Sequence, residues 1–226
     1  MSVSMSKKQY LQTIFELSGP KQDLVANKSV AEHLHLTPAS ISEMATHLRQ
    51  HGDIEVVPYH GMKLTDQGYE TAMKLIRAHR ILETFFVIHL KMSLAEAHKS
   101  ADAFDHDSSF DITNRLDAFL NFPSTNPSGL PIPNQDYQLP PHQFDALSSV
   151  HEDDKFVITA LADDYELLRF SETLHITINS KWRLSGHLSV DDGFYIQSLD
   201  NDQQQIGVTA KIAALIFVKT LPAIEQ

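Results

Sequence analysis

Cysteine is absent from this chain of 226 residues, and no apolar run approaches the roughly 20 residues that a membrane-spanning helix needs. Without thiols the chain can form neither disulfides nor zinc–thiolate clusters. The lysines near the N-terminus are not followed by a cleavable apolar core. The sequence also lacks a Gly-rich phosphate loop, an HExxH string and the setting of a Ser or Cys nucleophile. We therefore expect a cytoplasmic protein that does not act at a membrane, and the missing catalytic motifs lead us to expect that it is not an enzyme.

Basic residues are outnumbered, with 18 Lys and Arg against 29 Asp and Glu and a net charge of −11. The excess is unevenly distributed. Residues 1–80 hold nine basic and eight acidic side chains, whereas residues 81–226 hold nine and twenty-one. The front of the chain can therefore approach phosphates, while the rear would repel them and suits cation capture.

The first 70 residues have the apolar spacing of three short helices followed by a hairpin. Residues 6–17 and 27–36 give the first two helices. In residues 37–50, Thr37 is a suitable N-cap and Pro38 stands where a helix tolerates proline. The alternating stretch 53–68 predicts two strands that turn at His60-Gly61. This order is typical of a winged helix-turn-helix, which reads DNA with its third helix.

The third helix would bury one face and expose another that is small and polar. The buried face holds Ile41, Met44, Ala45 and Leu48, and the opposite face holds Ala39, Ser40, Ser42, Glu43, Thr46 and His47. Amphipathic helices of this kind are common, and most of them contact no DNA. The DNA-reading interpretation therefore depends on the hairpin and on the Thr37-Pro38 start as well.

Histidines and carboxylates cluster further along the chain, where two more helices are expected. His98, Asp102, Asp105 and His106 have steps of 4, 3 and 1, which places them on one helical face. His79 and Glu83 form a second pair, four residues apart on a long helix that begins near Thr65. Such donors favour ions such as Mn²⁺ or Fe²⁺. An ordinary charged hydrogen-bond network would also satisfy them.

A capping box of Ser93 and Glu96 starts the helix that carries His98. A further helix at about 109–120 has an apolar face wide enough to serve a dimer. Six of the ten prolines then fall between Pro123 and Pro141, which indicates a linker or an extended loop. From about Val150 the segments KFVITAL, LHITIN, HLSVDD, GFYIQSL and QQIGVT predict strands, with a turn at Asp191-Asp192-Gly193. They favour a small β-barrel.

These residues carry a family likeness: the chain resembles the diphtheria-toxin-repressor and manganese-transport-regulator family, and most of all its three-domain, manganese-responsive type from streptococci and related lactic-acid bacteria. The supporting strings are QYLQTIFEL, VAEHLHLTPASISEMATHL, GMKLTDQG, AHRILETFF, AEAHKSADAFDH and NFPSTNPSGLPIP. The resemblance implies a mainly α protein with a C-terminal β-barrel. Its domains would be a winged helix-turn-helix (1–72), a helical metal-binding and dimerisation domain with the Pro-rich linker (73–141), and an SH3-like β-domain (142–226).

The resemblance also implies two metal sites. His79, Glu83 and His98 match the ligands of one site, with Asp163 from the β-domain as a fourth. The other site would hold Gln9, Asp102, Asp105, His106 and Asn126. Relatives usually have Glu at the positions of Asp102 and Asp105, Asp or Met at Gln9, Cys at Asn126 and His at Ser128. Because these departures shorten or neutralise ligands, we expect the His79 site to be the more intact one.

The resemblance further implies a homodimer that binds a palindromic DNA operator when loaded with Mn²⁺ or Fe²⁺ and controls metal uptake. The expected DNA contacts are Thr37, Pro38, Ala39, Ser40, Ser42 and Thr46 on the third helix, with Lys28, Arg49 and Lys63 as phosphate contacts. Two alternatives stay open. One is a metal-independent winged-helix repressor with a degenerate site, and the other is a metal-dependent hydrolase.

Overall fold

The computed structural model describes residues 7–19, 22–104, 110–140, 145–189, 191–201 and 203–222. This part of the chain divides into two compact units. The first unit contains the described parts of Met1–Ala78 together with Pro133–Gln138. The second contains those of His79–Phe104, Ser109–Ile132 and Leu139–Gln226. Among the described residues, no helix has the length and apolarity needed to cross a bilayer.

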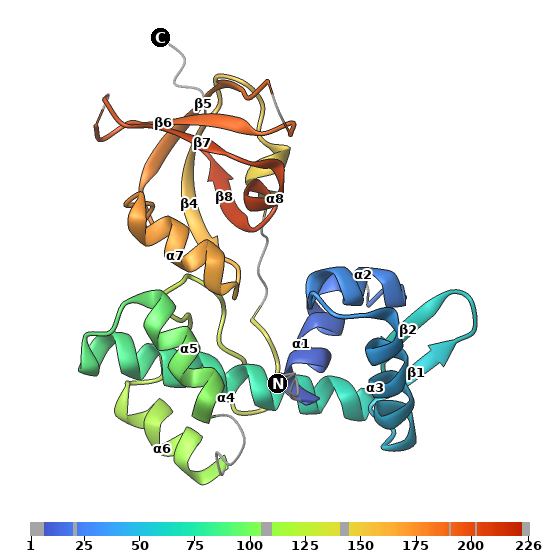
Figure 1. The fold of residues 1–226 in the computed structure, drawn as a ribbon. Coiled ribbons are helices and arrows are strands. Elements are labelled where there is room, and N and C mark those ends of the chain that lie inside the picture. Colours follow the sequence, from blue (N-terminus) through green and yellow to red (C-terminus); the bar gives the residue numbers. More distant parts are fainter. Residues whose placement is uncertain are drawn as a thin grey trace. The chain divides into compact units, whose positions relative to one another are not determined.

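The first unit begins with three helices and a β-hairpin (Figure 1), which are α1 (Lys7–Ser18), α2 (Asn27–His33), α3 (Pro38–Gln50), β1 (Ile54–Val57) and β2 (Gly61–Leu64). The strands are antiparallel, and their register runs from Ile54 opposite Leu64 to Val57 opposite Gly61. The helices and hairpin expected from the sequence are therefore confirmed. The turn between the strands lies one residue earlier than predicted, because Gly61 already belongs to β2.

Helix α3 begins as its sequence predicts. The Thr37 hydroxyl accepts a hydrogen bond from the backbone N–H of Ser40 at 3.2 Å, and Pro38 occupies the first turn, where its missing N–H costs nothing. Ile41, Ala45 and Leu48 are buried. The face that carries Ala39, Ser42 and Thr46 is exposed.

Gly61 fixes the hairpin against the segment that precedes α2. The backbone N–H and C=O of Met62 both bond to Val25 at 2.8 Å, and a Cβ on Gly61 would meet the Val25 carbonyl oxygen at 2.3 Å. We expect Gly61→Ala to lower the free energy of unfolding by about 2–4 kcal/mol, because a positive φ and a backbone collision act together. Gly19→Ala is the matched control, since Gly19 has a positive φ but open space around it. Equal losses in urea denaturation of the two variants would contradict this account.

Helix α4 (Asp66–Leu90) is a continuous helix of 25 residues. Its first turns belong to the first unit, and the turns from His79 onward belong to the second. The second unit adds α5 (Leu94–Phe104) and α6 (Phe110–Phe119). The predicted capping box is present, because the Glu96 carboxylate accepts from the Ser93 N–H and the Ser93 hydroxyl accepts from the Glu96 N–H.

Beyond the segment that follows α6, the second unit is an antiparallel sheet of six strands in the order β3-β8-β4-β5-β6-β7. Figure 1 shows strands β4 to β8 of this sheet. Its elements are β3 (Asp145–Ala146), the 3-10 helix η1 (Leu147–Ser149), β4 (Lys155–Leu161), α7 (Tyr165–Thr173), β5 (Lys181–His187), β6 (Phe194–Ser198), β7 (Gln205–Val208), α8 (Ala210–Ala213) and β8 (Ile216–Thr220). Large buried side chains such as Phe156 and Trp182 fill its core.

The predicted β-barrel is wrong in one respect, because the sheet does not close. Its edge strands are β3, with two residues, and β7, with four, and no ladder joins them within the described part of the chain. Buried and exposed residues alternate along β7. This alternation shows only that one face of the strand is covered, and it does not show whether the sheet closes. An open sheet covered by helices and a barrel therefore give the same sequence pattern.

Two predicted strands also need correction. LHITIN (174–179) is not a strand and follows α7, where only Ile176 is deeply buried. HLSVDD (187–192) contributes only His187 to a strand, because β5 begins at Lys181 and ends at His187. The predicted turn is supported at Asp191 and Asp192, which both have positive φ. Helix α7 was missed although Asp164 caps it by accepting from the Leu167 N–H at 2.8 Å.

Candidate metal centre

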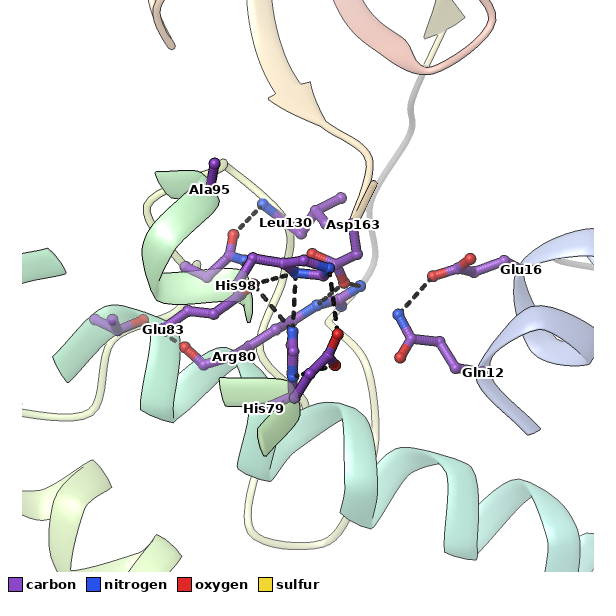
Figure 2. A network of polar contacts seen from close by, with 12 residues as sticks. Gln12, Glu16, His79, Arg80, Glu83, Ala95, His98, Leu130 and Asp163 are labelled. Atoms are coloured by element: carbon purple, nitrogen blue, oxygen red, sulfur yellow. Dashed lines mark hydrogen bonds and ion pairs between the residues drawn. The ribbon is translucent and has the colours of Figure 1, made fainter. Parts of the chain in front are cut away.

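Two helices of the second unit bring two imidazoles and a carboxylate together. His79 and Glu83 lie one turn apart on α4, and His98 lies on α5. All three side chains are buried, with exposed fractions of 1%, 3% and 7%. Figure 2 shows them pointing toward one another from the two helices. The pair His79 and Glu83 that the sequence predicted therefore joins His98, and we call these three residues the His–Glu–His triad.

The ligand atoms of the triad form a nearly regular triangle. His79 Nε2 lies 3.1 Å from His98 Nδ1 and 3.0 Å from Glu83 Oε1, and His98 Nδ1 lies 2.8 Å from that same oxygen. Bonds from a divalent ion to imidazole nitrogen or carboxylate oxygen are about 2.1 Å long, so neighbouring ligands of an octahedron lie about 3.0 Å apart. The triangle thus has the dimensions of one octahedral face, and three open positions would remain for other ligands.

The electrostatics of the triad keep its carboxylate charged. Burial by itself raises the pKa of Glu83, but the charges and hydrogen bonds of His79 and His98 hold that pKa well below its ordinary value. Burial lowers the pKa of His98, and the hydrogen bond to Glu83 outweighs it, so that the net shift is upward. An ionised carboxylate between two imidazoles is the form in which a divalent cation is bound.

The Pro-rich segment after α6 packs closely against the triad. Asn126 is 3% exposed, and its Nδ2 donates to Glu83 Oε2 at 2.7 Å. Its Oδ1 accepts from the backbone N–H of Leu130 at 2.8 Å. The Leu161 N–H donates to the Ser128 carbonyl at 2.8 Å, which ties the segment to the end of β4. The segment is therefore a packed extended loop rather than a slack linker.

Asp163, the predicted fourth ligand, lies just after β4 and is 1% exposed at its side chain. Its Oδ2 accepts from Arg80 Nη2 at 3.1 Å and from Arg80 Nε at 3.3 Å. Arg80 also donates from Nη1 to the Pro131 carbonyl at 2.7 Å. Asp163 is close enough for its charge to raise the pKa of His98 (Figure 2). The β-domain carboxylate thus lies beside the triad, paired with an arginine.

Helix α7 contacts the start of α5, the helix that carries His98. The Glu172 carboxylate accepts a hydrogen bond from the Ala95 N–H in the first turn of α5 at 3.0 Å. Together with the Ser93–Glu96 box, this contact satisfies N–H groups that a helix start otherwise leaves without partners. The helix that carries His98 is therefore held from two directions.

Of the residues predicted for the second site, Asp102 and Asn126 lie in the second unit, next to residues of the triad. Asp102 is partly exposed, and its carboxylate oxygens lie 3.6 Å from His79 Nδ1 and 3.9 Å from His98 Nε2. Asn126 lies beside Glu83, and Gln9 lies on α1 of the first unit. Asp105 and His106 lie outside the described residues, as does the predicted extension of their helical face.

The predicted DNA contacts lie on the first unit. Thr37, Pro38, Ala39, Ser42, Thr46 and Arg49 are exposed, and Ser40 is half-buried. The hydroxyls of Ser42 and Thr46 donate to carbonyls one turn earlier in α3, so their oxygens can still accept. Lys28 and Lys63 form ion pairs with Glu32 and Glu55 at 3.7 and 3.1 Å. Exposed pairs of this kind are weak and can open to admit a phosphate.

Sequence reasoning missed Arg80 and Glu172. Arg80 follows a predicted ligand directly and lies on a helix whose neighbours Ile76, Ile81 and Leu82 are buried. An arginine among such neighbours must be paired, so the position of Arg80 in the sequence already indicated a buried ion pair. Glu172 belongs to the helix that was not predicted. The sequence predicted only a wide apolar face on the helix at about 109–120. In the structure, residues of this helix line a shallow apolar groove made of Phe85, Ile112, Arg115, Leu116 and Phe119.

The first unit has the helix order and hairpin of DNA-binding domains. The second unit has a buried triad with metal-binding geometry. Together they define a class of metal-responsive DNA-binding regulators. Comparison with protein families agrees. Residues 2–62 match the N-terminal DNA-binding domain of the iron-dependent repressor, and residues 65–134 match its metal-binding and dimerisation domain. The two matches cover more than half of the chain. The chain belongs to the iron-dependent repressor family, and the hydrolase alternative is set aside.

Individual relatives support this assignment. The iron-dependent repressor IdeR of Mycobacterium tuberculosis is 30% identical over 124 residues, which are 55% of this chain and 54% of that protein. The match therefore spans about half the length of this relative. A manganese-dependent transcriptional repressor in complex with manganese is similar in structure, with a TM-score of 0.78 and 27% identity over 96% of this chain and 100% of that one. The manganese regulator SloR gives a TM-score of 0.81 and 28% identity over 97% and 100%.

Proposed function

We propose that this protein is a metal-dependent transcriptional repressor that binds palindromic operators as a homodimer when it is loaded with Mn²⁺ or Fe²⁺, and that it controls uptake of that metal. In this proposal residues 1–72 form a winged helix-turn-helix, residues 73–141 a metal-binding and dimerisation domain, and residues 142–226 an SH3-like domain. The observation that carries the proposal is the triangle of His79 Nε2, Glu83 Oε1 and His98 Nδ1, with sides of 2.8–3.1 Å.

An ordinary hydrogen-bond network is the alternative explanation of the triad. Such a network is open to the triad, because Glu83 Oε1 lies within hydrogen-bonding distance of both His79 Nε2 and His98 Nδ1. A divalent ion would satisfy all three atoms at once. The donor set favours Mn²⁺ and Fe²⁺ because it offers imidazole and carboxylate and no thiolate. Asp163 is the proposed fourth ligand, and it would exchange Arg80 for the ion.

The ion would act on DNA binding indirectly. Palindromic operators place two recognition helices one DNA turn apart, about 34 Å, or a multiple of it. We propose that metal-loaded dimers favour this spacing, so that the ion shifts a population of conformations and contacts no base. A shift from a mostly inactive to a mostly active ensemble needs a preference of about 5.5 kcal/mol for the active state.

The exposed face of α3 would enter the major groove in this function. Its residues Ala39, Ser42 and Thr46 are small, so the helix backbone can approach the bases closely. Affinity would then depend largely on phosphate contacts, for which Lys28, Arg49 and Lys63 are the proposed residues. Phe119 lines the apolar groove and is 63% exposed. We propose that this groove is the contact with the second copy of the chain in the homodimer.

Calorimetric titration of chelator-stripped protein with Mn²⁺, Fe²⁺ under anaerobic conditions and Zn²⁺ tests this function. Binding to a duplex selected from a random pool by the manganese-loaded protein is measured in parallel. We expect saturable heat with Mn²⁺ and Fe²⁺ and operator binding at least about tenfold tighter with metal, a coupling of typical size. Absence of heat with every ion would end the metal-sensor proposal. Equal operator affinity with and without metal would select the metal-independent repressor.

A further inference from the structure

We infer that Asn126 is not a metal ligand in this protein but the positioning residue that fixes Glu83, and that it does so by donating a hydrogen bond. The inference rests on the proposed function, since it concerns the same ion. It assigns separate roles to the two oxygens of one carboxylate. Oε1 of Glu83 faces the two imidazoles, whereas Oε2 faces Asn126.

The orientation of the Asn126 amide follows from its neighbours. A backbone N–H can only donate, so the group that receives the Leu130 N–H at 2.8 Å must be the amide oxygen. The amide nitrogen is then the group that lies 2.7 Å from Glu83 Oε2. An amide nitrogen can only donate, so Glu83 Oε2 is the acceptor of this hydrogen bond. Both ends of the amide are therefore occupied, and its oxygen is turned toward the loop and not toward the triad.

The loop gives Asn126 little freedom to turn. The backbone N–H of Asn126 donates to the Leu130 carbonyl, and the Gly129 N–H donates to the Asn126 carbonyl, each at 2.9 Å. Gly129 has a φ of +82°, and a Cβ there would meet the Thr159 carbonyl oxygen of β4 at 2.1 Å. Arg80 holds the next turn of the loop through the Pro131 carbonyl. The loop is thus anchored to α4 and to β4 by the residues that directly follow Asn126.

Glu83 is consequently expected to bind the ion through Oε1 alone. Its other oxygen would have to abandon a buried hydrogen bond before it could join, and a buried amide left without a partner is costly. Residues that orient a ligand typically alter metal affinity by about 10–100-fold when they are changed. Asn126 should act within this range, although it never touches the ion.

Asn126→Asp separates the two roles. An aspartate carboxylate can still accept from the Leu130 N–H, but while ionised it cannot donate to Glu83, and it adds a negative charge there. We expect Mn²⁺ binding, measured by calorimetry, to weaken by at least about tenfold. A ligand role predicts the opposite, since an anionic oxygen is a stronger ligand than an amide oxygen. Affinity equal to or tighter than that of the unaltered protein would overturn the inference.

A second readout and a control keep the result interpretable. Hydrogen exchange of the Leu130 amide in metal-free protein should stay slow in Asn126→Asp and become fast in Asn126→Ala, which shows that the loop survives the first change. Asn134→Asp is the matched control, because the Asn134 side-chain oxygen likewise accepts from backbone N–H groups, those of Asp136 and Gln138, but the side chain has no carboxylate partner among its described contacts. It should leave Mn²⁺ affinity unchanged. If the unaltered protein binds no Mn²⁺, the proposed function fails as well, whereas binding that Asn126→Asp does not weaken removes only the positioning role.

Discussion

Replacing His79 with alanine is expected to abolish metal-stimulated operator binding while the chain stays folded. His79 supplies one corner of the ligand triangle and is 1% exposed, and an alanine side chain has no atom that could bind the ion. Changes to residues that merely orient a ligand already cost about 10–100-fold in metal affinity. Removal of a direct ligand should therefore weaken Mn²⁺ binding by more than about 100-fold.

The His79 variant is measured by calorimetry and by gel shift with and without Mn²⁺, and circular dichroism checks its fold. His151→Ala is the matched control, because it removes an imidazole that is 90% exposed and that pairs with Asp154 and not with the triad. The control should behave like the unaltered protein. Retained stimulation by metal in His79→Ala would show that His79 is not a ligand.

Arg80→Met is expected to destabilise the metal-free protein by about 3–5 kcal/mol, the usual cost of removing one partner of a buried ion pair. Both side chains are nearly inaccessible, at 5% for Arg80 and 1% for Asp163, so the carboxylate would stay buried without its arginine. If Asp163 is a ligand, Mn²⁺ can replace the lost cation. The rise in melting temperature on adding Mn²⁺ should then be larger for Arg80→Met than for the unaltered protein.

Arg183→Met provides the comparison for that experiment. Arg183 is 40% exposed and lies 3.8 Å from Asp153, so its loss should change the free energy of unfolding by less than about 1 kcal/mol. Metal should stabilise this variant as it stabilises the unaltered protein. A Mn²⁺-induced shift that is no larger in Arg80→Met than in the other two proteins would exclude Asp163 from the ligand set.

The parts of the fold that sequence predicts well are those decided by neighbouring residues. The Thr37 cap, the Ser93–Glu96 box and the i,i+4 pair of His79 and Glu83 each depend on a few adjacent positions. Their geometry follows from helix periodicity alone. The same local reasoning placed α3 and its exposed face.

The parts that sequence did not predict depend on contacts between distant residues. Arg80 and Asp163 are 83 positions apart, and Glu172 reaches Ala95 across 77. The density of proline left a linker and an extended loop as alternatives, and the contacts that decide for the loop are distant ones: Arg80 and β4 anchor its backbone, and it brings Asn126 to Glu83. Edge closure of the sheet is equally non-local, which is why an open sheet was mistaken for a barrel.

A crystal structure of the manganese-loaded protein, with anomalous diffraction collected to locate Mn²⁺, tests the central claim most directly. The account predicts one strong anomalous peak within bonding distance of His79 Nε2, His98 Nδ1 and Glu83 Oε1, with Asn126 still bonded to the other oxygen of Glu83. A triad that remains hydrogen-bonded within itself in manganese-saturated crystals, with no anomalous density among its three atoms, would contradict the account.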